Sequence, residues 1–99
     1  MSSHTLDHTD DPVGPVIVAA GELDLLTAPD LAAAMAEALE NEHQTLTIDV
    51  SGVTFCDSTG LRALLSAPGH RPVRLKAPST VLLRLLELTS TADRFEIVH

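Results

Sequence analysis

The sequence predicts an α/β domain in which parallel strands are joined by helical crossovers. Three observations indicate this class: short apolar runs alternate with segments of helical periodicity, the loops between them are short, and 99 residues allow one core but not two. Hydrophobic residues make up 44% of the chain, so such a core can form. With two Phe and no Tyr or Trp, it must be aliphatic.

The N-terminal part of the chain predicts a leader and a first strand. Residues 1–12 are polar and end in Pro, which is typical of a flexible N-terminal leader with at most a short edge strand around residues 5–6. The folded domain is then expected over residues 13–99. The compact apolar run 16–20 predicts a buried strand that ends at Gly21.

A first helix is predicted to begin at Thr27. The Thr27 hydroxyl can cap it, Pro29 fits its first turn, and Asp30 completes a Thr-x-x-Asp capping pattern. Residues 45–50 then alternate apolar and polar, which predicts a strand, followed by a turn at residues 51–52. The apolar stripe expected along the helix comprises Leu31, Met35, Ala38 and Leu39.

The second half repeats this alternation. A second helix is predicted over residues 57–65, before the Pro-Gly pair at 68–69. Residues 73–76 predict a short strand, Ser79 can cap a third helix, and residues 95–98 predict a closing strand. The expected buried face of the third helix comprises Val81, Leu82, Leu85 and Leu86.

Charge is distributed unevenly around a net value of −8. Residues 1–61 hold eleven acidic residues and no Lys or Arg, whereas residues 62–99 hold all six basic residues and three acidic ones. An acidic chain repels phosphate backbones and anionic lipids, so direct nucleic-acid and membrane binding are disfavoured. The N-terminus lacks a secretory signal pattern, which predicts a cytoplasmic location. The acidic part either keeps the protein soluble or steers a basic partner.

No cofactor or metal site is predicted. The single cysteine, Cys56, cannot form an internal disulfide and is interpreted as a small buried residue. His4 and His8 are spaced like metal ligands near Asp10 and Asp11, but a leader segment offers no preformed frame to hold an ion.

The most informative stretch is the start of the second helix, with Asp57, Ser58, Thr59 and Gly60 in its first turn. A helix start has unpaired N–H groups and tolerates an anion well. Gly60 has no side chain, so another backbone or a phosphate can come close. From these residues alone two interpretations stay open, a purely structural N-cap and a functional site.

Three segments carry a resemblance to a known family: LTIDVSGVTFCDSTGLRALL, the upstream turn GELD, and the downstream PSTVLLRLLELTSTADRFEI. Together they resemble the anti-sigma factor antagonists, bacterial members of the STAS domain family, over about residues 16–98. The resemblance implies a small, mixed but mostly parallel sheet of four to five strands flanked by helices. It also implies that the unphosphorylated protein binds an anti-sigma factor and so releases a sigma factor.

The resemblance assigns roles to individual residues. In that family the serine directly after the Asp is phosphorylated, usually by the anti-sigma factor acting as a serine kinase, and here that serine is Ser58. Asp24 matches the acidic residue of the family's turn near the binding face. Asp57, Thr59 and Gly60 are expected to shape the partner surface, with Thr59 a candidate second acceptor. A phosphatase is a further candidate partner.

The chain departs from the family's pattern between Leu65 and Val73. Relatives usually carry a longer second helix there, whereas this chain has only the segment Ser66–Pro72. The phosphoacceptor end of the helix is kept, but outer surface is lost.

Three other functions compete with this interpretation. A STAS-like module could bind a small ligand or nucleotide at the same helix start. A receiver domain with Asp49 or Asp57 as acceptor would need an acidic pair after its first strand and a Lys near its last, which this chain lacks. A serine hydrolase would need a base and an oxyanion hole, and no Gly-x-Ser-x-Gly surrounds Ser58. The sequence therefore predicts a phosphorylation-controlled binding protein and not an enzyme.

Overall fold

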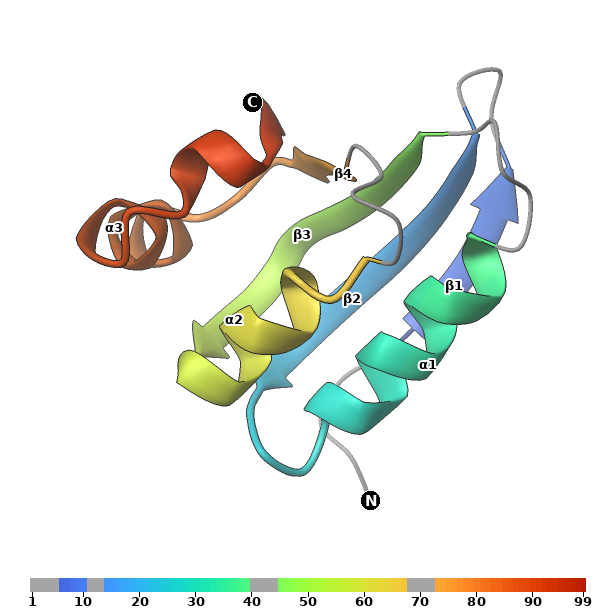
Figure 1. Cartoon of the computed structure of the whole chain (residues 1–99), viewed down its shortest axis with the longest axis horizontal. Coiled ribbons are helices and arrows are strands. Elements are labelled where there is room, and N and C mark those ends of the chain that lie inside the picture. The colour runs from blue at the N-terminus through green and yellow to red at the C-terminus, as the bar shows by residue number, and fades with distance from the viewer. Residues whose placement is uncertain (1–5, 11–13, 40–44, 68–72) are drawn as a thin grey trace.

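The computed structural model describes residues 6–10, 14–39, 45–67 and 73–99. Within these ranges five strands form one sheet in the order β1-β2-β3-β4-β5, and β1 is antiparallel to β2 while the other neighbours are parallel (Figure 1). The predicted α/β class with a mixed, mostly parallel sheet is confirmed. The elements are β1 (Leu6–Asp10), β2 (Pro15–Leu23), α1 (Ala28–Ala38), β3 (Leu46–Cys56), α2 (Ser58–Leu64), β4 (Val73–Lys76), α3 (Thr80–Leu88), the 3-10 helix η2 (Ala92–Arg94) and β5 (Glu96–Val98).

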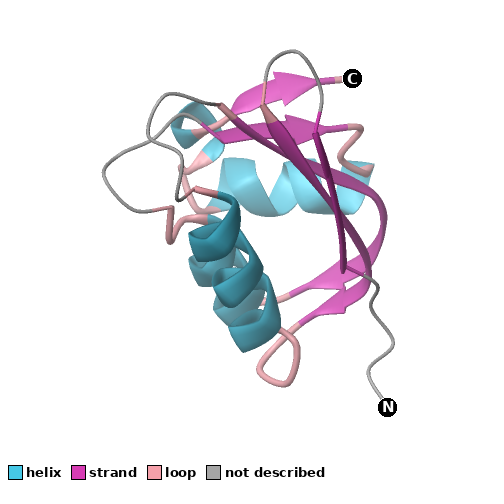
Figure 2. Cartoon of the chain, turned by 90° about the vertical axis from the view of Figure 1, so that its right-hand side faces the viewer, coloured by secondary structure: helices cyan, strands magenta, loops and turns pink. Residues whose placement is uncertain are grey.

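The helices of the described part pack on one face of this sheet (Figure 2). Alternate strand residues point into the core, as in the row formed by Ile17 on β2, Ile48 on β3 and Leu75 on β4. Each crossover returns a helix over the same face, so a single aliphatic core forms between the two layers. Its fully buried helical members are Leu31 and Met35 of α1, Leu64 of α2, and Leu82 and Leu86 of α3.

Strand β1 corrects the leader prediction. Residues 6–10 pair with β2, from Leu6 opposite Ala19 to Asp10 opposite Pro15. The edge of β2 presents backbone N–H and C=O groups that need partners, and an added strand satisfies them whatever its side-chain pattern. The remainder of the predicted leader, which includes His4 and Asp11, lies outside the described residues.

Strands β2 and β3 are longer than predicted, because the glycines expected to end them lie inside them. Gly21 adopts a positive φ of 86°, and the β2–β3 register shifts on either side of Ala20–Gly21. A Cβ on Gly52 would lie 2.8 Å from the Cβ of Ala20. Small residues at this crossing let the two strands bend and stay paired as far as Leu23 and Cys56.

Two predictions about individual helix residues are wrong: the cap at Thr27 and the burial of Val81. Thr27 occupies the N-cap position of α1, but its hydroxyl does not cap the helix and instead donates to the Glu22 carbonyl oxygen (2.7 Å). Val81 of α3 is 64% exposed, because this helix buries a narrow stripe through Leu82 and Leu86 and Val81 lies beside it. The predicted Ser79 cap is confirmed by a hydrogen bond from the Leu82 N–H to its hydroxyl (3.2 Å).

Candidate functional site

The predicted site lies where β2 and β3 end side by side. Leu23 and Cys56 are paired at the last positions of these strands. The N–H of Asp57 donates to the Leu23 carbonyl oxygen (3.1 Å), which ties the loop after β3 to β2. Asp24 and Asp57 therefore begin two neighbouring loops at the carboxyl edge of the sheet, where open α/β sheets place their sites.

Asp57 is the N-cap of α2. One of its carboxylate oxygens, Oδ1, accepts hydrogen bonds from the backbone N–H groups of Thr59 and Gly60, both at 2.9 Å. Two of the donors at the helix start are thus satisfied within the chain. Ser58, the first residue of the helix, is exposed, and Thr59 is half-buried.

Asp24 plays a structural part that the sequence did not indicate. Its Oδ1 accepts from the N–H groups of Leu26 (3.0 Å) and Thr27 (3.2 Å), and its carbonyl oxygen accepts from the Ala28 N–H (2.8 Å). The Asp24 N–H in turn donates to the Thr27 hydroxyl (2.9 Å). Asp24 therefore organises the turn that leads from β2 into α1.

Two substitutions of Asp24 distinguish the effect of its hydrogen bonds from the effect of its charge. Asn retains the acceptor oxygen, so we expect Asp24→Asn to keep the free energy of unfolding within about 1 kcal/mol of wild type, whereas Asp24→Ala should lower it by about 1 kcal/mol. Urea unfolding of both variants measures this difference. Equal stability of the Ala variant and wild type would show that the hydrogen bonds to Oδ1 contribute nothing.

Gly60 lies inside the site and not on its surface. The residue is buried, and a Cβ placed on it would lie 2.7 Å from the Cβ of Leu23 and closer still to the Leu23 carbonyl oxygen. The backbone that approaches Gly60 is thus that of β2 in the same chain. This corrects the expectation that Gly60 belongs to the partner surface, because its role is to seat α2 on the end of β2.

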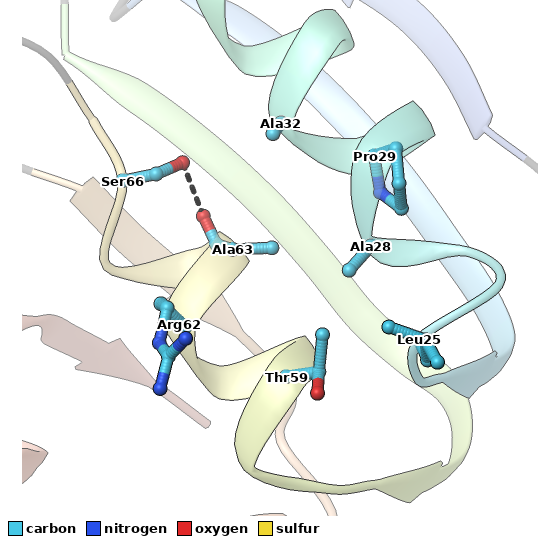
Figure 3. A pocket seen from close by; sticks show the side chains of 8 residues that line it. All are labelled: Leu25, Ala28, Pro29, Ala32, Thr59, Arg62, Ala63 and Ser66. Atoms are coloured by element: carbon cyan, nitrogen blue, oxygen red, sulfur yellow. Dashed lines mark hydrogen bonds between the residues drawn. The ribbon is translucent and has the colours of Figure 1, made fainter.

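Apolar side chains around the site escaped the sequence prediction. Leu25 is 72% exposed, Leu26 85% and Phe55 49%. The signal for Leu25 and Leu26 in the sequence is that this Leu-Leu pair directly follows the Gly-Glu-Leu-Asp turn, outside any strand or helix pattern, whereas Phe55 lies within β3. Leu25 also borders a groove of about 280 Å³ between α1 and α2, opposite Thr59 (Figure 3).

Neither a membrane-spanning helix nor a metal-binding cluster is found among the described residues. None of their helices combines the length and hydropathy needed to cross a bilayer. They also contain no group of three or more His, Cys, Asp or Glu side chains arranged to hold a metal ion. The His4–Asp11 cluster considered above falls largely outside this part of the chain.

Comparison with known proteins identifies the family. The model of the family described as "Mlab, STAS domain" matches residues 5–98, nearly the whole chain. The chain belongs to the STAS domain family. The resemblance seen in the sequence over residues 16–98 is thereby confirmed. The family match begins at residue 5 and so also includes strand β1.

Three proteins similar to this STAS domain are anti-sigma factor antagonists. The anti-sigma-B factor antagonist of Listeria monocytogenes is 34% identical over 98 residues, covering 92% of this chain and 79% of that protein. A crystal structure of an anti-sigma factor antagonist from Mycobacterium paratuberculosis superposes with a TM-score of 0.85 at 27% identity, covering 97% of this chain and 86% of that one. The anti-sigma factor antagonist SpoIIAA in its unphosphorylated form shares the fold, with a TM-score of 0.69 at 17% identity over 98% of this chain and 88% of its own.

Cys56 of the STAS domain is buried directly before the Asp57 cap. Burial, and to a lesser degree the negative charge of Asp57, raises the pKa of its thiol to about 11. The reactive thiolate is therefore scarce near neutral pH, and Cys56 is a packing residue.

Alkylation by iodoacetamide tests this protonation state. With a pKa of about 11, only about one Cys56 in a thousand is ionised at pH 8, so the native protein should react slowly and about tenfold faster per pH unit up to pH 10. The urea-unfolded chain, with an ordinary thiol pKa near 8.5, is the control and should react quickly. Fast alkylation of the native protein at pH 8 would contradict the buried, protonated thiol.

Proposed function

We propose that this chain is an anti-sigma factor antagonist that works by partner switching. Its unphosphorylated form binds an anti-sigma factor with serine kinase activity and so frees a sigma factor, and phosphorylation of Ser58 ends this binding. A phosphatase that restores the unphosphorylated form completes the cycle, which takes place in the cytoplasm. The names of the relatives support the first half of this proposal.

One observation carries the choice of Ser58. It is exposed at the first position of α2, while the neighbouring Asp57 carboxylate is turned onto the helix's own N–H groups. A kinase can therefore reach the Ser58 hydroxyl without opening the fold. Thr59 is half-buried beside Leu25, which makes it the poorer acceptor. Asp24 and Asp57 border the same surface and belong to the proposed contact with the partner.

The same geometry weighs against a nucleotide or other anionic ligand at residues 57–60. Such a ligand would bind through the N–H groups at the helix start. Those of Thr59 and Gly60 are already occupied by Asp57, whose negative charge also repels an anion. The partner-binding function is therefore better supported than the small-ligand alternative.

Phosphate incorporation tests the assignment. Treated with the anti-sigma factor and ATP, the wild-type protein should gain one phosphate by intact-mass measurement, and Ser58→Ala should gain none while it still binds the partner. The substitution removes only an exposed hydroxyl, so the fold should be retained. Thr80→Ala is the matched control, because Thr80 is an exposed hydroxyl residue at the corresponding first position of α3 and lies outside the groove; it should be phosphorylated like wild type. Full incorporation into Ser58→Ala would overturn the assignment.

A further inference from the structure

We propose that the groove between α1 and α2 is the apolar anchor point of the anti-sigma factor interface. It receives one apolar side chain that the partner carries among basic residues. This inference rests on the proposed function and adds a second contact to it, one that governs affinity even when Ser58 carries no phosphate.

The groove is lined by small and apolar side chains. Ala28 and Ala32 of α1 face Ala63 of α2, and their short side chains leave a depression of about 280 Å³ (Figure 3). Leu25 borders it at the end nearest the loops. Small-molecule sites usually enclose about 300–1,000 Å³, and this groove is smaller and open along its length. A single protruding side chain therefore fits it better than a free ligand.

The loop beside the groove displays its leucines rigidly. Leu25 and Leu26 are 72% and 85% exposed, yet the turn that carries them is held by the hydrogen bonds to Asp24 Oδ1. The buried Thr27 hydroxyl fixes the same turn through the Glu22 carbonyl oxygen at 2.7 Å. A preorganised loop loses little conformational entropy on binding, so exposed leucines on it are suited to an interface.

Charge around the groove selects the partner. Asp24 directly precedes Leu25 and Asp57 lies two residues before Thr59, so two carboxylates stand on the loops at this end of the groove, while Arg62 is the charged residue among the described lining residues. A surface with an apolar centre and an acidic border is complementary to an apolar side chain flanked by Lys or Arg.

The groove is also continuous with the proposed phosphoacceptor. Thr59, the neighbour of Ser58, lines it opposite Leu25. A partner that covers both Ser58 and Thr59 therefore also reaches the loop end of the groove. For this reason we assign the groove to the anti-sigma factor that phosphorylates Ser58 and not to a separate protein.

Titration calorimetry with that anti-sigma factor tests the role of the leucines. Leu25 borders the groove and contacts the partner's apolar side chain in this proposal, and loss of such a contact typically weakens binding by tenfold or more, so we expect at least a tenfold rise in Kd for Leu25→Ser. Leu88→Ser is the matched control, since Leu88 is 78% exposed on α3 and lies outside the groove. It should change Kd less than about twofold, and thermal melts should show both variants folded.

Filling the groove provides an independent test. Ala32→Leu occupies the depression with a good helix former and should also weaken binding at least tenfold. Ala33→Leu, exposed on the same helix but outside the lining, should leave Kd unchanged. If Leu25→Ser and Ala32→Leu both bind like wild type while phosphorylation of Ser58 still abolishes binding, the anchor is wrong and the proposed function stands. If the unphosphorylated wild type does not bind, both are overturned.

Discussion

Gly60→Ala should destabilise the domain by about 3 kcal/mol or prevent it from folding. The added Cβ would overlap the Leu23 backbone, which is held in the β2–β3 pairing and cannot move aside as a flexible side chain would. Overpacking commonly costs about 1–3 kcal/mol and more where backbone must shift. Against a total stability of about 5–15 kcal/mol for a typical domain, this is a severe loss.

Whether Gly60→Ala lowers or raises the free energy of unfolding shows whether the site of Gly60 is obstructed. In an unobstructed helix, replacing Gly by Ala stabilises by about 1 kcal/mol. Urea unfolding of Gly60→Ala should show the opposite change. Gly52→Ala serves as the comparison, because its nearest neighbour is a methyl group, the Ala20 Cβ at 2.8 Å, and should cost less. Unchanged or increased stability of Gly60→Ala would contradict the close seating of α2 on β2.

Phosphorylation of Ser58 should leave the melting temperature within a few degrees of the unmodified protein. A phosphate adds about −1.5 to −2 charges, and an anion in the first turn of a helix is favoured by about 0.3–1 kcal/mol. Repulsion from Asp57 opposes this by about 1 kcal/mol for charges 4 Å apart in water. Arg62, four residues further along the exposed side of α2, offers a compensating i,i+4 pair worth about 0.2–0.5 kcal/mol. Thermal melts of both forms measure the net effect.

The interface should respond very differently from the isolated fold. Pressing the phosphate into the interface desolvates it at a cost of several kcal/mol, and the basic partner residues proposed around the apolar anchor are paired with Asp24 and Asp57 and not with Ser58. Because each 1.4 kcal/mol is tenfold in affinity, we expect binding to weaken by about 100-fold or more. Asp57 next to Ser58 and Asp24 on the neighbouring loop add to the negative charge, and the weak pair with Arg62 offsets only a small part of it.

Local patterns predicted those features of the molecule that depend on local interactions. Apolar spacing and helix-capping residues located the three α-helices and strands β2 to β5 of the described residues, but not the 3-10 helix η2 or most of β1. The caps at Asp57 and Ser79 followed from residue type and position. Features set by distant contacts were missed. Gly21 was interpreted as a strand end because its role in the irregular β2–β3 pairing depends on residues of β3.

The same distinction holds within the site. Ser58 and Asp57 could be singled out from one contiguous segment. The burial of Gly60 depends on Leu23 of another strand, and the part played by Asp24 depends on how the turn after β2 folds back on Thr27. The groove requires two helices that meet only in the tertiary structure.

We expect phosphate on Ser58 to block partner binding while the fold stays intact. Titration of the anti-sigma factor with both forms of the protein, under identical conditions, tests this most directly. The unphosphorylated form should bind with a measurable Kd, and the Ser58-phosphorylated form should bind at least about 100-fold more weakly while it melts within a few degrees of the unmodified protein. Equal affinities, or a large drop in melting temperature that accompanies the loss of binding, would contradict this mechanism.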